Sequence, residues 1–200
     1  AGKGTQCRRV AEHYGIPHIS TGEILRNAVR QGTVVGHRVK KVLDEGRLVE
    51  DDLMVSLVQG RIGEADARIN GYVLDGFPRT LGQAEAFDEI SEVRPVNVVI
   101  DLEVQRDVVL TRLSARRTCQ KCDANFISIG KDPNPWTCEQ CGGVVHQRDD
   151  DTPEAINHQL DLYDQLTAPI VRYYQKAAIL VVLDVLCSQD EVFARLIAHY

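Results

Sequence analysis

The stretch Ala1-Gly2-Lys3-Gly4-Thr5 opens the chain and decides how the rest of the sequence is interpreted. A phosphate-binding loop has the pattern G-x-x-x-x-G-K-[ST] and lies between a buried strand and a helix. Gly2 and Lys3 match the second half of that pattern, with Gly4 at the usual Ser/Thr position and Thr5 one residue later. We therefore expect this chain to be a fragment of a slightly longer natural protein, which would contain the preceding strand and the first glycine of the loop.

Alternating helices and strands are predicted after this loop. A helix from Gln6 to Tyr14 has Gly15 at its end, and Ser20-Thr21-Gly22-Glu23 has the spacing of a capping box that opens a second helix. Further helices are expected at 35–45, from 51, at about 104–116, after Pro153 and after Ser188, and strands at 71–74, 96–100 and 179–183. Short apolar strands separated by helices predict an α/β fold with a doubly wound parallel sheet.

Length and composition fit one domain with insertions. The chain has 200 residues, of which 44% are hydrophobic, and this is enough to bury a core. Its formal net charge is −6, so the field of the whole protein does not attract nucleic acid or an anionic membrane, and any polyanion must bind at a local arginine cluster. The sequence contains no run as long as a membrane span and no visible secretory signal. We expect a cytoplasmic monomer that binds neither nucleic acid nor membrane.

Four of the six cysteines, Cys119, Cys122, Cys138 and Cys141, form two C-x2-C pairs separated by fifteen residues. This is the spacing of a tetrahedral zinc site built from two knuckles. Because the phosphate-binding motif lies elsewhere in the chain, we expect this zinc to be structural. Disulfide pairing of these four cysteines is the alternative. Cys7 and Cys187 lie far from each other in the sequence, and we expect them to be buried thiols in a reducing cytoplasm, where disulfides are rare.

Four stretches together resemble one known family. They are Gly2-Lys3-Gly4-Thr5-Gln6, Ile19-Ser20-Thr21-Gly22, Leu74-Asp75-Gly76-Phe77-Pro78-Arg79-Thr80 and the four-cysteine insertion, in this order. From residue 1 to about residue 184 the chain resembles adenylate kinase in its long form, which has a zinc-bearing lid. The resemblance implies a P-loop nucleoside monophosphate kinase fold whose first strand is missing from this chain. It divides the chain into a core (1–19, 50–115 and 152–200), an AMP-binding insert (20–49) and a lid (116–151).

The activity implied by this resemblance is phosphoryl transfer. The enzyme would be a phosphotransferase that interconverts Mg·ATP and AMP with two ADP, maintaining the adenine nucleotide pool without a covalent enzyme intermediate. Its cofactors would be one structural zinc ion per chain and the magnesium ion that accompanies ATP. Phosphoryl transfer depends mainly on positioning and positive charge, so the arginines and lysines matter more than any nucleophile.

On the ATP side, Lys3 is placed to reach the β- and γ-phosphates. The resemblance gives the surrounding backbone amides, which sit at a helix N-terminus, to Ala1, Gly2, Gly4 and Thr5. Asp75 ends an apolar strand, where a carboxylate can hold magnesium through water; a helix or turn cap is the alternative. In the lid, Asn125 and Phe126 are implied to form a platform beside the adenine and ribose, although Phe126 fits the lid core equally well.

On the AMP side, the resemblance assigns the adenine to the hydroxyl of Thr21 and the AMP phosphate to the guanidinium of Arg26. Gln83 would read the adenine edge, because an amide donates and accepts at once; an exposed helical residue is the bland alternative. The remaining AMP-binding residues would be Arg47, Leu48 and Val49 through their backbone, then Gly76, Phe77, Pro78 and Arg79, and finally Arg148 and Gln159.

The lid is expected to bring further arginines to the transferring phosphates. Arg112 and Arg116 are spaced i, i+4, so a helix over 104–116 would project both from one face. In the family, this pair and Arg148 converge when the lid closes, and one or two acidic residues of 149–151 would pair with lid arginines. The implied catalytic set is Lys3, Asp75, Arg79, Arg112, Arg116 and Arg148.

Two positions depart from the family pattern. Gln159 stands where the family usually has an arginine, eleven residues after the lid arginine, and it carries no charge to offset the transition state. Val185 follows Asp184, where the family often has a glycine near the adenine. Both departures leave the nucleotide site recognisable and predict a lower catalytic rate.

Other function classes remain as alternatives. Another nucleoside monophosphate kinase differs only in the base it accepts, and Thr21 with Gln83 favours AMP. A nucleotide-binding protein of reduced activity is suggested by Gln159. A zinc-ribbon nucleic-acid binder is opposed by the segment between the knuckles, where Lys131 is the only basic residue, and by the acidic balance of the chain.

Overall fold

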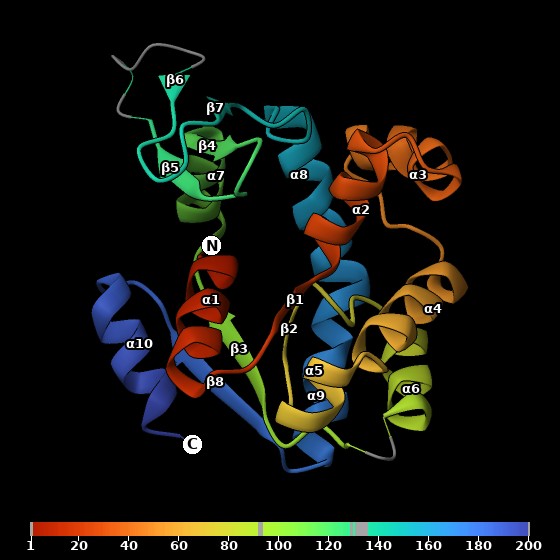
Figure 1. Ribbon diagram of the computed structural model, residues 1–200. Coiled ribbons are helices and arrows are strands. Elements are labelled where there is room, and N and C mark those ends of the chain that lie inside the picture. Colours follow the sequence, from red (N-terminus) through yellow and green to blue (C-terminus); the bar gives the residue numbers. More distant parts are fainter. Residues whose placement is uncertain (1, 92–93, 129, 131–135, 200) are drawn as a thin grey trace.

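The computed structural model describes residues 2–91, 94–128, 130 and 136–199 (Figure 1). The helices are α1 (Lys3–Tyr14), α2 (Thr21–Arg30), α3 (Val34–Asp44), α4 (Asp51–Ile62), α5 (Ala65–Asn70), α6 (Leu81–Ile90), α7 (Arg106–Ser114), α8 (Pro153–Leu162), α9 (Ala168–Lys176) and α10 (Gln189–Ile197). The strands are β1 (His18–Ser20), β2 (Val73–Asp75), β3 (Val99–Glu103), β4 (Arg116–Cys119), β5 (Asn125–Ile127), β6 (Trp136–Thr137), β7 (Val144–His146) and β8 (Leu180–Asp184).

Two parallel strand pairs lie at the centre of the molecule. Strand β1 pairs with β2 so that Ser20 lies opposite Asp75, and β3 pairs with β8 so that Ile100 lies opposite Val181. Helices lie on both sides of these strands, with α1 and α10 on one side and α4, α6 and α9 on the other (Figure 1). The predicted α/β fold is therefore confirmed, and it places the end of β2 beside the first turn of α1.

Two apolar clusters anchor the helices to the strands. One joins helices α2 and α3 to α4 and α6, and its most buried members include Leu25, Val39, Val58 and Phe87. The other packs α1 and α10 against β8 through Val10, Leu183 and Leu196, among others.

Helices α8 and α9 form one nearly continuous rod that crosses the molecule (Figure 1). A π-helical turn over Tyr163–Thr167 joins them, just before Pro169, whose ring nitrogen has no hydrogen to donate. The hydroxyl of Thr167 donates to the carbonyl oxygen of Arg79 at 2.9 Å. The turn thus helps to position the loop that follows β2.

A separate antiparallel sheet sits at the end of α7, in the strand order β5-β4-β7-β6. It carries the four cysteines and lies above the parallel strands in Figure 1. Its small core includes Cys119, Cys138 and Val145, with Phe126 and Trp136 packed against them. The ring centroids of Phe126 and Trp136 are 6.2 Å apart.

Local capping signals mark the ends of several helices. Helix α10 begins after Ser188, as predicted, with a capping box formed by Ser188 and Glu191, and Gly15 ends α1 with a φ of 65°. At α2, Ser20 caps the backbone of Glu23, but the Glu23 carboxylate binds Arg8 at 2.6 Å instead of returning to the cap. Within the described ranges, no helix has the length and apolar character needed to cross a bilayer.

Candidate nucleotide site and metal centre

The start of α1 lies against the end of β2. Gly2 precedes the helix with a φ of 96°, a conformation that favours glycine, and the helix begins at Lys3. A Cβ atom on Gly4 would lie 3.3 Å from Oδ2 of Asp75. Because the N-terminus of a helix carries a partial positive charge, this arrangement places a carboxylate and an anion-binding helix end side by side.

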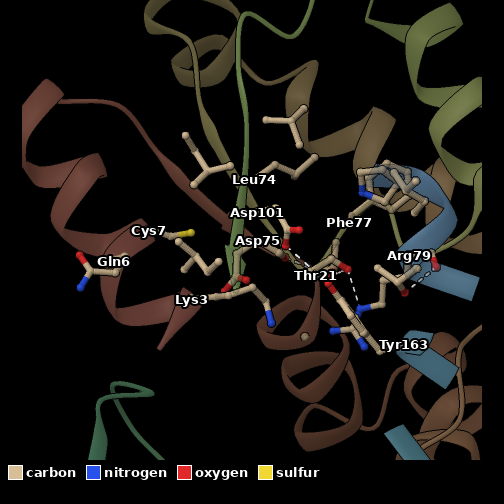
Figure 2. Close-up of a pocket in the computed structure, with 18 of the residues that line it drawn as sticks. Lys3, Gln6, Cys7, Thr21, Leu74, Asp75, Phe77, Arg79, Asp101 and Tyr163 are labelled. Atoms are coloured by element: carbon tan, nitrogen blue, oxygen red, sulfur yellow. Dashed lines mark hydrogen bonds between the residues drawn. The ribbon is translucent and has the colours of Figure 1, made fainter. Parts of the chain in front are cut away.

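The side chain of Lys3 and the carboxylates of Asp75 and Asp101 lie near the start of α1 (Figure 2). Burial opposes ionisation of Asp75, yet the combined effect of His18, Lys3 and Arg79 lowers its pKa below the usual range. At Asp101 burial prevails and raises the pKa, although the Tyr163 hydroxyl and the Lys3 charge act the other way. Asp75 is therefore ionised at neutral pH and available to a cation. Ala1, also predicted at the ATP site, lies outside the described residues.

The loop after β2 is held by hydrogen bonds to its own carbonyl groups. The hydroxyl of Thr21 donates to the carbonyl oxygens of Asp75 and Gly76 at 3.2 and 3.0 Å, and Nε of Arg79 donates to that of Gly76 at 2.8 Å. Gly76 has a φ of 82°, and a Cβ there would lie 2.9 Å from the Thr21 hydroxyl, so this position requires glycine. The Phe77–Pro78 peptide bond is cis. The loop thereby presents Arg79 from a fixed backbone.

Gln83 is buried in the first turn of α6, with 2% of its surface exposed. Its Nε2 donates to Oδ1 of Asp51 at 2.7 Å, and its Oε1 accepts from the backbone N–H of Arg79 at 2.8 Å. The hydroxyl of Thr80 donates to the other oxygen of Asp51 at 2.7 Å. Both ends of the Gln83 amide are thus engaged, and Asp51 is an organising residue that the sequence did not reveal, because its partners are about thirty residues away.

Three guanidinium groups, those of Arg26, Arg116 and Arg148, gather beside the loop from three different elements. Burial, reinforced by the charges of Arg116 and Arg26, lowers the pKa of Arg148 to about 10. Burial also lowers the pKa of Arg26, and its Nε is buried without a hydrogen-bond partner among the described residues. Burial lowers the pKa of Arg79 as well, and the charge of Arg26 contributes in the same direction. Such a concentration of desolvated positive charge favours binding of a polyanion.

Arg148 and Asn125 are connected across the antiparallel sheet. Nε of Arg148 donates to the hydroxyl of Thr118 at 2.8 Å, and its NH2 group donates to Oδ1 of Asn125 at 3.0 Å. Asn125 is exposed and lies at the start of β5. Its side chain therefore positions an arginine in this structure.

The prediction that Arg112 and Arg116 project from one helix face is wrong. Helix α7 ends at Ser114, and Arg116 is the first residue of β4, where it pairs with Ile127 of β5. The backbone hydrogen bonds of this strand pair replace a further helical turn. Arg112 instead donates to the carbonyl oxygen of Val185 at 3.5 Å.

A large cleft connects most of the predicted nucleotide-binding residues. The predicted residues that line it are Lys3, Thr21, Arg26, Arg47, Leu48, Val49, Asp75, Gly76, Phe77, Pro78, Arg79, Gln83, Arg116, Arg148 and Gln159. Gly2, Gly4, Thr5, Arg112, Asn125 and Phe126 are not among its lining residues. Gln159 is half-buried, and its Cγ would lie 3.3 Å from a Cβ on Gly46.

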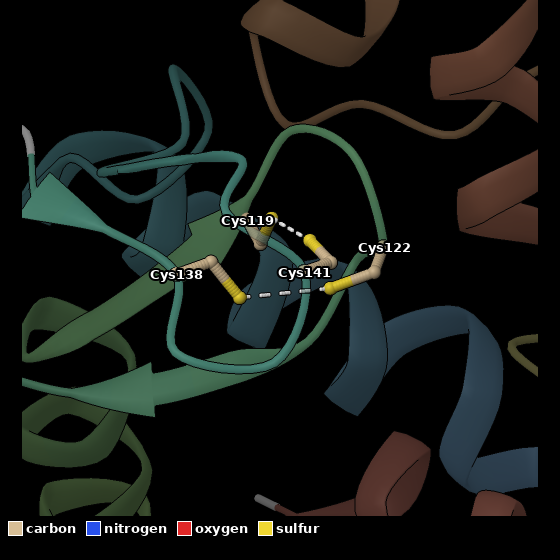
Figure 3. Close-up of side chains that lie close together, drawn as sticks. All are labelled: Cys119, Cys122, Cys138 and Cys141. Carbon is tan, nitrogen blue, oxygen red and sulfur yellow. Dashed lines mark hydrogen bonds between the residues drawn. The ribbon is translucent and has the colours of Figure 1, made fainter.

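The predicted knuckles bring four thiols together (Figure 3). The sulfur atoms of Cys119 and Cys141 are 3.5 Å apart, those of Cys122 and Cys138 are 3.8 Å apart, and all four lie within 4.8 Å of one another. Sulfur ligands of a tetrahedral zinc ion, each about 2.3 Å from the metal, are separated by about 3.8 Å. A Cβ on Gly143 would lie 2.8 Å from the sulfur of Cys119, so a side chain at this position would collide with the thiol. These residues fit a metal ion.

Asp123, which follows the first cysteine pair, contacts α1 and α2. Oδ2 of Asp123 lies 3.0 Å from NH2 of Arg30 at the end of α2, and its carbonyl oxygen accepts from NH2 of Arg8 on α1 at 2.8 Å. Arg8 in turn binds Glu23 of α2 at 2.6 Å. The antiparallel sheet, α1 and α2 are therefore linked by one chain of charged contacts.

Comparison with known proteins agrees with these features. The family model described as Adenylate kinase matches residues 1–179. The adenylate kinase of Methanosarcina mazei is 44% identical over 187 residues, which cover 92% of this chain and 86% of the relative. That of Archaeoglobus fulgidus is 43% identical over 187 residues with the same coverage, and that of Lachnospira eligens is 40% identical over 200 residues, covering 98% and 93%.

Proposed function

The chain belongs to the adenylate kinase family, and from this premise we propose that it transfers a phosphoryl group reversibly from Mg·ATP to AMP, giving two ADP. It is a phosphotransferase of adenine nucleotides, and its cellular role would be to balance the adenine nucleotide pool. The observation that carries the proposal is the convergence of Lys3, Asp75 and Arg79 with the arginine group of Arg26, Arg116 and Arg148.

On the ATP side, we assign the β- and γ-phosphates to Lys3 and to the backbone amides at the start of α1. Lys3 is exposed at the helix N-terminus, so it is free to reach a phosphate. Asp75 would hold magnesium through water, because its carboxylate is ionised and lies beside Gly4. When bound, magnesium supplies positive charge to the phosphate oxygens.

On the AMP side, Arg79 and Arg26 would bind the phosphate, and the loop after β2 would form the floor of the site. The adenine would lie near Thr21, Gln83 and the backbone of Arg47 to Val49, all of which border the cleft. To hydrogen-bond the adenine, the Gln83 side-chain amide must give up one of its present hydrogen bonds, because its Nε2 donates to Asp51 and its Oε1 accepts from the backbone N–H of Arg79.

The arginines act by opposing charge that builds up during transfer. Arg116 and Arg148 come from the antiparallel sheet and its following loop, so their approach to the phosphates depends on where that sheet lies. Arg112 would join them on the ATP side. We propose that residues 116–151 and 20–49 move against the core of 1–19, 50–115 and 152–200, and that closure excludes water from the phosphates. The Arg30–Asp123 contact supports a closed arrangement of these two units.

The four cysteines would hold one structural zinc ion. Four thiolates with closed tetrahedral geometry suit zinc and leave no open coordination position for catalysis. A reducing compartment such as the cytoplasm would keep these thiols available as ligands. We propose a monomer whose partners are ATP, AMP and ADP, with no role in nucleic-acid binding, since the net charge is −6.

Gln159 favours a second possibility, a nucleotide-binding protein of reduced activity. The cleft residue at this position is neutral, so one positive charge fewer faces the phosphates. Assaying the purified protein with ATP, magnesium and each of AMP, UMP, CMP and GMP separates the possibilities. Rapid consumption of AMP alone supports the proposal, preference for another monophosphate replaces it with a different kinase, and tight AMP binding with negligible turnover supports the second possibility.

A further inference from the structure

Three potential metal ligands from different elements meet behind the phosphate-binding end of α1. They are the thiol of Cys7 in α1, the imidazole of His18 at the start of β1 and the carboxylate of Asp75 at the end of β2. One ligand atom from each lies within 4.8 Å of the other two. Cys7 extends from α1 in the direction of Asp75 (Figure 2). The four-cysteine centre is a different site, on the antiparallel sheet.

His18 supplies an independent sign that this cluster is incomplete. Its side chain is only 10% exposed, and its Nε2 is buried with no hydrogen-bond partner among the described residues. Oδ2 of Asp75 lies 3.6 Å from Nε2 of His18, which is too long for a hydrogen bond. A buried imidazole nitrogen without a partner costs free energy, and a bound cation would remove that cost.

The separations suit a cation placed between the three groups. Donor atoms around a tetrahedral zinc ion, at about 2.0–2.3 Å from the metal, are about 3.3–3.8 Å apart. The 3.6 Å between His18 and Asp75 falls within this range, and the wider 4.8 Å limit needs only a small movement of the Cys7 side chain. A thiolate and a carboxylate would together neutralise the charge of a divalent ion.

We propose that Cys7, His18 and Asp75 form a second metal site, which takes a borderline-soft divalent transition ion such as Zn²⁺ or Co²⁺. A sulfur, a nitrogen and an oxygen ligand favour such ions over Mg²⁺, which binds oxygen almost exclusively. Three protein ligands leave a fourth position for water, so binding here is expected to be weaker and more readily reversed than at the four-cysteine centre.

Occupation of this site would withdraw Asp75 from magnesium. This consequence rests on the proposed function, in which the same carboxylate holds the magnesium of Mg·ATP. The transition ion would therefore inhibit phosphoryl transfer by competing with magnesium for the carboxylate of Asp75, at the wall of the nucleotide cleft. The site would make the enzyme sensitive to free transition ions.

The binding test uses protein whose four-cysteine centre is first filled with zinc and then freed of excess metal. Titration with Co²⁺ should add one equivalent and a thiolate-to-cobalt absorption band in the near ultraviolet. Cys7→Ala should abolish this band, and His18→Gln should weaken cobalt binding by about 10-fold or more, as even indirect partners of a metal contribute that much. The matched control is Cys187→Ala, which removes a half-buried thiol from an apolar cluster elsewhere and should keep both signals.

Absence of the additional equivalent in the unmodified protein, or its persistence in Cys7→Ala, would overturn the site. Neither readout requires activity, so this result is independent of the proposed function. In the activity arm, Zn²⁺ should slow transfer in the unmodified protein much more than in Cys7→Ala, and added Mg²⁺ should relieve the inhibition. Cobalt binding without any inhibition by Zn²⁺ would overturn the competition with magnesium.

Discussion

Arg116 and Asp151 form a two-point ion pair that joins the first residue of β4 to the start of α8. Nε of Arg116 donates to Oδ2 of Asp151 at 2.9 Å, and its NH2 group contacts the second carboxylate oxygen. The Asp151 side chain is fully buried, whereas that of Arg116 is 21% exposed. An arginine assigned to the transferring phosphates is thus held by the protein itself at the junction between the antiparallel sheet and the core.

Arg116 therefore has a structural role in its ion pair with Asp151, in addition to its proposed catalytic role at the phosphates. Substitutions at the two positions can distinguish these roles. We expect Arg116→Ala to lower kcat by about 100-fold or more, as loss of a transition-state charge does, with little change in the KM for AMP. Arg79→Ala should raise that KM and also lower kcat, because Arg79 lies in the loop beside the proposed AMP phosphate. Steady-state kinetics with varied AMP distinguishes the two patterns.

The control for this comparison is Asp151→Asn, which keeps Arg116 and removes the negative charge of its partner. It should lower the Tm and leave kcat within a few-fold of the unmodified value. Equal defects confined to KM in Arg79→Ala and Arg116→Ala would contradict the assignment, since uniform loss of binding does not lower kcat.

We expect Arg26 to lower the stability of the folded protein and to strengthen AMP binding. Burial lowers its pKa, so the folded protein bears a cost for keeping this arginine charged at every pH where the unfolded chain is protonated. Arg26→Met removes the charge and keeps the apolar stem, and it should raise the free energy of unfolding by about 1 kcal/mol. The same change should weaken AMP binding. Thermal unfolding and calorimetric titration with AMP measure the two effects.

Arg38→Met serves as the matched control for Arg26. Arg38 lies on the neighbouring helix α3, where it is exposed and pairs with Glu50. This change should affect neither stability nor AMP affinity noticeably, because surface pairs contribute little. A loss of stability in Arg26→Met, with AMP affinity intact, is the outcome that the account does not allow.

We expect the neutral side chain of Gln159 to limit the rate of phosphoryl transfer. A single arginine acting on transferring phosphates contributes about 10³-fold or more, although the other arginines of the cleft cover part of the deficit. Gln159→Arg should therefore raise kcat, with a smaller change in ATP affinity. His158→Arg, an exposed neighbour on α8, adds the same charge outside the cleft and should change little. An unchanged or lower kcat in folded, zinc-loaded Gln159→Arg would refute the idea.

The proposed zinc ion should stabilise the protein more than it assists the reaction. Cys138→Ser removes a buried thiol of the four-cysteine centre and should lower the Tm by several degrees, since about 2–4 °C accompanies each kcal/mol in a chain of this size. Activity measured well below that temperature should fall less. Cys187→Ser is the control that should retain zinc. Metal analysis of protein prepared without chelator checks the assignment, and zinc contents well below one per chain would count against it.

Local signals located most of the fold in advance. The capping residues Ser20 and Ser188 and the glycine after α1 act within a few residues of themselves, and the helices they bound appear where they were expected. The end of α7 was misplaced because no glycine or proline follows it. Pairing of β4 with β5 and β7 decides that boundary, and such long-range pairing leaves no mark in the local sequence.

In the candidate site too, features that depend on neighbouring residues could be predicted from the sequence, whereas contacts between distant segments could not. The glycine loop, the segment 75–79 and the four cysteines could be found from spacing, because their chemistry depends on neighbouring residues. The contacts of Gln83 with Asp51 and the meeting of Cys7 with His18 could not, because they depend on how separate helices and strands pack.

Phosphorus NMR of the purified protein with ATP, AMP and Mg²⁺ follows the proposed phosphoryl transfer directly. We expect the ATP and AMP signals to decline together while two ADP form for each AMP consumed, with no inorganic phosphate released. The mixture should approach the same equilibrium when the reaction starts from ADP. Release of inorganic phosphate without loss of AMP, or no exchange among the three nucleotides in folded, zinc-loaded protein, would contradict it.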